Sequence, residues 1–139
     1  MSELDPAAND VGTKERSMAV FDRRVESAAD ARTWLTSFLH ERDVDEPTMM
    51  DAALIVSELV TNALRHGEGS TVLRAALSPT EVQLSVTDSG DGEPRMLPPD
   101  PDRIGGLGLI VVDRVAAEWG VAQFPGGKTV WALLARPGP

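Results

Sequence analysis

The centre of the chain carries a carboxylate and an amide one helical turn apart. Glu58 and Asn62 lie in a stretch of helical apolar periodicity, so on a helix their side chains are neighbours. At about 100° per residue, Asp51 and Arg65 fall on the same side. Carboxylate and amide oxygens suit Mg²⁺, and a carboxylate can instead orient or deprotonate a hydroxyl nucleophile. A solvated helix face is the alternative, but the small apolar flanking residues favour a core helix.

A second acidic position ends the most regular predicted strand. Asp88 begins the segment 88–92, which reads DSGDG. A carboxylate at a strand end can accept a hydrogen bond from an exocyclic amine such as that of adenine. Gly90 and Gly92 lack Cβ atoms, so their backbone can approach a flat base closely. A plain turn of common turn residues has the same composition, so this segment alone leaves both interpretations open.

A glycine cluster at 105–108 precedes the third predicted helix. Backbone N–H groups at Gly106, Leu107 and Gly108 would face an anion favoured by the helix dipole, although a flexible hinge has the same sequence. The spacing matches neither a dinucleotide fingerprint nor a Walker loop. The intervening segment 93–104 holds four prolines and is too long for a turn. It is either a lid over a ligand or a disordered loop.

The predicted elements that position these residues form an α+β fold. Periodicity and turn residues predict a strand at 18–25, helices at 27–42 and 45–66, strands at 71–77 and 81–87, a helix at 107–119, and strands at 121–124 and 128–135. Ser27 is predicted to cap the first helix, and Gly67 to end the second. This order predicts a two-layer sandwich with helices on one face of a mixed, mostly antiparallel sheet. Residues 1–17 are predicted to be a flexible tail, and 18–137 one domain.

Composition excludes several classes of function. The net charge is −9 and there is no cysteine and only two histidines. The charge disfavours general nucleic-acid binding, and the missing thiols exclude disulfides and thiolate metal sites. No apolar run is long enough for a membrane span, and the polar N-terminus does not resemble a signal peptide. A cytoplasmic location is the resulting expectation.

Four segments in order resemble the nucleotide site of the histidine-kinase-like ATPase (GHKL) superfamily, which includes gyrase, heat-shock chaperones, MutL-type repair proteins and sensor histidine kinases. Residues 54–66 (LIVSELVTNALRH) resemble its N box, 88–92 (DSGDG) its first glycine box, 105–109 (GGLGL) its second, and 127–131 (GKTVW) a late strand with an adenine-supporting threonine. The similarity spans about residues 18–136. It implies the Bergerat ATP-binding fold, with ATP and Mg²⁺ as cofactors.

The resemblance assigns roles to the helix residues. It implies that Asn62 ligates Mg²⁺ and that Glu58 is the general base or positions a water molecule. Arg65 would lie near the nucleotide. Arg103, in the proline-rich segment, would meet the terminal phosphate.

The resemblance also assigns roles to the strand and glycine residues. Asp88 would bind the adenine amine with Gly92 beneath the base, and Thr129 would support Asp88 directly or through water. The phosphates would be held by Gly106, Gly108 and N–H groups of the following helix.

The chain looks most similar to the bacterial anti-sigma-factor serine/threonine kinases. This similarity implies a protein that binds a sigma factor and transfers the γ-phosphate of ATP to a serine of an antagonist protein. It also implies a homodimer formed through the sheet side away from the nucleotide. The alternatives are a non-catalytic, ATP-dependent binding switch and a plain structural domain whose motifs are coincidental.

Overall fold

A computed structural model describes residues 15–66, 68–89 and 109–137. The element order β, α, α, β, β, α, β, β is confirmed. The elements are β1 (Glu15–Phe21), α1 (Ser27–His40), α2 (Glu46–His66), β2 (Thr71–Leu77), β3 (Glu81–Asp88), α3 (Leu109–Val115), β4 (Glu118–Phe124) and β5 (Gly127–Ala135).

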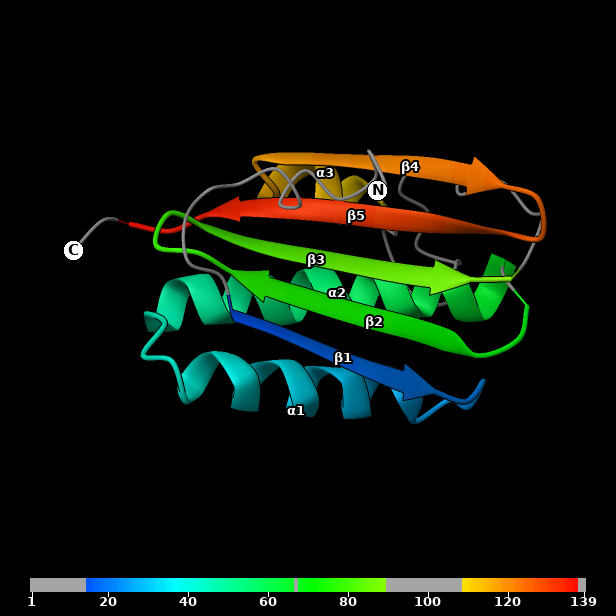
Figure 1. The fold of residues 1–139 in the computed structure, drawn as a ribbon, viewed down its shortest axis with the longest axis horizontal. Helices are drawn as coiled ribbons and strands as arrows, with labels where there is room; N and C mark the ends of the chain where they lie inside the picture. The colour runs from blue at the N-terminus through cyan, green and yellow to red at the C-terminus, as the bar shows by residue number, and fades with distance from the viewer. Residues whose placement is uncertain (1–14, 67, 90–108, 138–139) are drawn as a thin grey trace.

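The described strands form one five-stranded sheet in the order β1-β2-β3-β5-β4. Every neighbouring pair is antiparallel, so the predicted mostly antiparallel sheet is antiparallel throughout. Figure 1 shows the helices on one face of this sheet, with α2 between α1 and α3. The predicted two-layer α+β architecture is therefore confirmed.

The core lies between α2 and the centre of the sheet. On β3, Val82, Leu84 and Val86 are all buried, because alternate residues of a strand point to the same face. Their partners on β5 are Leu134, Ala132 and Val130. The helices contribute buried apolar side chains at helical spacing: Ala31, Leu35, Leu39, Ala52, Ile55, Val56, Leu59, Val60 and Ala63. The predicted apolar faces of the first two helices are thus the core faces.

Several element boundaries differ from the prediction, and two of the differences have a clear physical reason. Strand β1 begins at Glu15, inside the segment predicted as a tail, because its ladder runs along all of β2, from Leu77 to Thr71. Trp119 belongs to β4 and not to the third helix, since it pairs with Ala132. Its indole Nε1 donates to Asp113 of α3 at 2.8 Å, which joins the helix to the strand that follows it.

The helix starts are built differently from each other. Asp45 caps α2, because its carboxylate accepts hydrogen bonds from the backbone N–H and the hydroxyl of Thr48. These bonds hold the pKa of Asp45 below its ordinary value. The predicted cap of α1 is wrong. Ser27 is the first residue of that helix, and its hydroxyl donates to the carbonyl oxygen of Asp22. Residues 1–14 and the predicted helix stop at Gly67 lie outside the described part.

Candidate functional site

Two buried oxygen atoms on α2 mark the candidate site. Asn62 is 6% exposed, and its Oδ1 has no hydrogen-bond partner within the described ranges. The same holds for Oε2 of Glu58, one turn earlier on the helix. A buried polar atom without a partner costs free energy, so two such atoms one turn apart indicate a site that a ligand completes.

Burial changes the acidity of Glu58. Desolvation raises the pKa of this carboxyl group above its ordinary value, and the charge of Arg65 opposes the shift. Arg65 is itself exposed, two turns further along α2. A carboxylate with a raised pKa is a stronger base than an exposed glutamate, which suits the predicted role in proton transfer.

The last turn of α2 is fixed by a side chain from outside the helix. The guanidinium of Arg23, which follows β1, donates to the carbonyl oxygens of Ala63 and Leu64. Carbonyl groups at a helix end lack partners within the helix, and a cation there also suits the helix dipole. Arg23 therefore anchors the turn that carries Asn62.

The end of α2 and the end of β3 meet at the same end of the molecule (Figure 1). The backbone N–H and the hydroxyl of Ser89 both donate to the carbonyl oxygen of Glu68, each at 3.1 Å. Asp88 shares the strand face of Val86, because alternate residues point the same way, and that face is the one packed against α2. The structure thus places Asp88 on the same side of the sheet as Asn62.

Asp88 lies against a lysine that the sequence analysis passed over. Lys128 stands opposite Asp88 in the β3–β5 ladder, and its Nζ donates to Asp88 Oδ1 at 3.1 Å. The two side chains are 1% and 2% exposed. A lysine is almost never buried unless it is paired, so this ion pair is a built feature of the sheet end.

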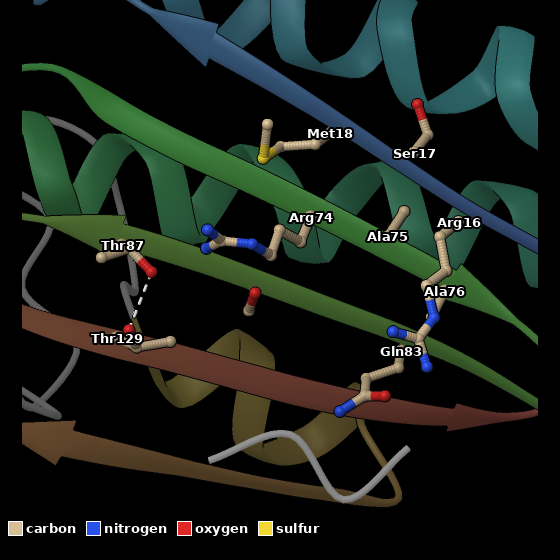
Figure 2. Close-up of a pocket in the computed structure, with 10 residues that line it drawn as sticks. Arg16, Ser17, Met18, Arg74, Ala75, Ala76, Gln83, Thr87 and Thr129 are labelled. Carbon is tan, nitrogen blue, oxygen red and sulfur yellow. Dashed lines mark hydrogen bonds between the residues drawn. The ribbon is translucent and has the colours of Figure 1, made fainter. Parts of the chain in front are cut away.

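Thr129 is not the residue beside Asp88. Its hydroxyl is hydrogen-bonded to that of Thr87 at 2.8 Å (Figure 2). Thr129 and Thr87 are paired across the ladder and lie one residue from Lys128 and Asp88, so they point to the opposite face of the sheet. In this geometry Lys128, and not Thr129, donates a hydrogen bond to Asp88.

The described residues fit a magnesium ion held jointly with a ligand. Among them, no three histidine, aspartate or glutamate side chains are gathered as a metal site. Mg²⁺ commonly takes only one or two protein ligands and completes its octahedron with water and phosphate oxygens. Asn62 Oδ1, which has no hydrogen-bond partner in the described part of the chain and lies one turn from Glu58, meets that requirement.

A separate cavity of about 580 Å³ lies over the face of the sheet that the helices leave uncovered (Figure 2). It is lined by residues of β1, β2, β3 and β5: Arg16, Ser17, Met18, Arg74, Ala75, Ala76, Gln83, Ser85, Thr87 and Thr129. Since Asp88 and Asn62 lie on the other side of the sheet, this cavity is not the predicted nucleotide site.

The glycines of both predicted glycine boxes lie outside the described residues. Five residues predicted to bind the phosphates or the base are in this part of the chain: Gly90, Gly92, Gly106, Leu107 and Gly108. The predicted lid, which includes Arg103, lies there too. In the part of the chain that is described, no helix is long and apolar enough to cross a membrane.

Comparison with known proteins gives the family. Residues 21–134 match the family described as histidine kinase-like ATPase domain. The RsbU and RsbW domains of Rv1364c from Mycobacterium tuberculosis share the fold, with a TM-score of 0.67 and 24% identity over 89% of this chain and 33% of that chain. The catalytic domain of histidine kinase ThkA gives a TM-score of 0.48 and 15% identity over 86% of this chain and 96% of that one. This chain spans about a third of the Rv1364c structure. By the match across most of its length, the chain belongs to the histidine kinase-like ATPase domain family.

Proposed function

We propose that the protein binds Mg-ATP between α2 and the end of β3 and acts as an anti-sigma-factor serine/threonine kinase. The observation that carries the proposal is a pair of buried oxygens on Glu58 and Asn62 that have no hydrogen-bond partner among the described residues, on the same side of the sheet as Asp88. Family membership supports the nucleotide, and the likeness to a fold that includes an RsbW domain motivates the choice of partner class.

The residues divide the work of such a reaction. Bound Mg-ATP supplies the transferable phosphoryl group and the charge of the metal. Asn62 Oδ1 is a metal ligand, and Asp88 accepts a hydrogen bond from the adenine amine. Glu58 takes the proton of the acceptor serine hydroxyl, a task that its raised pKa favours. Phosphoryl transfer depends mainly on positioning and charge stabilisation, which suits a site built from few side chains.

The proposed partners are a sigma factor and an antagonist protein that carries the acceptor serine. We expect capture of partner proteins from the native cell, with and without ATP, to identify both. Purified partner, γ-labelled ATP and this chain should then give a phosphorylated serine on the antagonist. ATP-dependent capture without any labelled product would instead favour the alternative, a non-catalytic binding switch.

A matched pair of variants tests the role of the base. Glu58→Gln should keep nucleotide binding within a few-fold of wild type but lower phosphoryl transfer at least 100-fold, the lower range for a general base. Asp51→Asn changes an exposed carboxylate of the same helix and should leave transfer unchanged. Full transfer by Glu58→Gln would refute the assignment.

A further inference from the structure

The Asp88–Lys128 ion pair places an acceptor and a donor side by side at the sheet end. We infer that Lys128 is a second base-reading residue, which donates to N1 of adenine while Asp88 accepts from the 6-amino group. The inference rests on the proposed nucleotide function and specifies how this chain selects its nucleotide.

The pair is positioned by the sheet. Asp88 and Lys128 are directly opposite each other in an antiparallel ladder, so their side chains leave the same face together. The next residue at the turn, Gly127, holds the strand close. A Cβ at that position would lie 2.3 Å from the carbonyl oxygen of Asp88. The Cα positions of the two residues are therefore set by paired strands.

A purely structural role explains the pair poorly. Burial of two charges carries a large desolvation cost, and well-packed apolar residues often give equal or greater stability at such positions. Lys128 heads the group of largest fully buried side chains among the described residues. Its ammonium group has three donors and a carboxylate has about four acceptor sites, and the bond between them uses one donor and one acceptor.

The edge of adenine matches this arrangement. Its 6-amino group is a donor and the neighbouring N1 is an acceptor, which complements an adjacent carboxylate and ammonium. Guanine has an acceptor, O6, in place of the amine and an N1–H donor in place of N1. In the same pose guanine would set O6 against Asp88 and N1–H against Lys128. Specificity would therefore come both from the two matched contacts with adenine and from the two mismatched contacts with guanine.

Nucleotide analogues test the contact one atom at a time. We would measure binding of ADP, of 1-deaza-ADP, which has C–H in place of N1, and of GDP, by calorimetry with Mg²⁺. Wild type should bind 1-deaza-ADP at least ten-fold more weakly than ADP, as expected for loss of a hydrogen bond to a charged group. Lys128→Met removes the donor, and the ratio between the two ligands should fall below three-fold.

Two further variants keep the experiment decisive. Threonine is a favoured strand residue, so Lys128→Thr provides a second test if Lys128→Met does not fold. It should also lower the ratio between the affinities for ADP and 1-deaza-ADP to below three-fold. Gln83→Met alters a buried polar residue on the other face of the sheet and should preserve it.

The outcomes separate the two levels of the argument. Equal wild-type affinity for ADP and 1-deaza-ADP would overturn the inference alone, as would an unchanged ratio in the Lys128 variants. Absence of ADP binding by wild type would overturn the proposed function, and this inference with it.

Discussion

At the scale of single residues, the burial that raises the pKa of Glu58 also lowers the stability of the folded protein when Glu58 is ionised. Burial favours its neutral form, so the folded protein holds the Glu58 proton more tightly than the unfolded chain does. Ionisation of Glu58 therefore reduces the stability of the fold as the pH rises through the raised pKa. Sites that carry such groups commonly sacrifice stability for function.

The first prediction follows from this sign. Without nucleotide, Glu58→Gln should raise the free energy of unfolding at pH 8, by no more than about 1 kcal/mol because solvent screens this half-buried group. The gain should shrink toward pH 4, where wild-type Glu58 is itself protonated. Urea denaturation at both pH values measures it. A variant less stable than wild type at pH 8 would contradict the assigned cost.

Asn62 carries the second prediction. Its Oδ1 makes no hydrogen bond within the described ranges, so Asn62→Ala removes little that holds the fold together. We expect at least a ten-fold loss of Mg-ATP affinity, with nucleotide binding in EDTA almost unchanged. Calorimetry with and without Mg²⁺ measures both. Tight Mg-ATP binding by the variant would exclude Asn62 as the metal ligand.

At the scale of elements, the β4–β5 hairpin controls the shape of the site through two neighbouring glycines with different constraints. Gly126 has a φ of 88° with open space around its Cβ position, so it needs only a residue that tolerates the left-handed region. Gly127 has no room, because a Cβ would meet the backbone of Asp88 and the ring of Phe124.

The third prediction compares these glycines. Asn is the side chain that best tolerates positive φ, so Gly126→Asn should lower stability by less than about 1 kcal/mol. Gly127→Asn must displace β3 or β5 and should cost about 1–3 kcal/mol, the usual price of overpacking, with weakened nucleotide binding. Thermal denaturation of both variants, with and without ADP, measures the difference. Equal losses would show that the close approach at Gly127 is not limiting.

Sequence patterns predicted the elements whose periodicity is unambiguous. Helix α2 and strand β3 were correct because one set of residues makes both the pattern and the core. Strand β5 is apolar on both faces, with Val130, Trp131, Ala132 and Leu133 in succession, so alternation could not tell which of its residues faces inward. The family resemblance assigned the support of Asp88 to Thr129, and the strand pattern gave no reason to choose Lys128 instead. The signal that could have found it is a lysine inside an apolar strand, which needs a buried partner.

At the scale of the whole molecule, ligand binding and folding are linked. A ligand that binds only the folded state raises the free energy of unfolding by about 2.7 kcal/mol at 100 times its dissociation constant. For a domain of this size, that is a rise in Tm of roughly 10 °C. Within the described ranges the buried oxygens of Glu58 and Asn62 have no hydrogen-bond partner, and we expect a bound nucleotide and metal to supply partners.

The fourth prediction is a stabilisation that depends on the metal. ADP with Mg²⁺ at 100-fold excess over its dissociation constant should raise the Tm by roughly 10 °C, and EDTA should remove most of the rise. The Asn62→Ala variant serves as the control, because it should respond to ADP equally with and without Mg²⁺. A wild-type Tm that no adenine nucleotide changes would contradict the proposed function.

Arg23 connects the edge of the sheet to the end of α2 that carries Asn62. This residue lies two positions after β1, an edge strand of the described sheet, and its guanidinium donates to carbonyl oxygens in the last turn of α2. A partner protein that bound the outer edge of β1 and displaced this strand would therefore disturb the turn of α2 that carries Asn62. By thermodynamic reciprocity, metal binding at Asn62 would then weaken the binding of such a partner at β1.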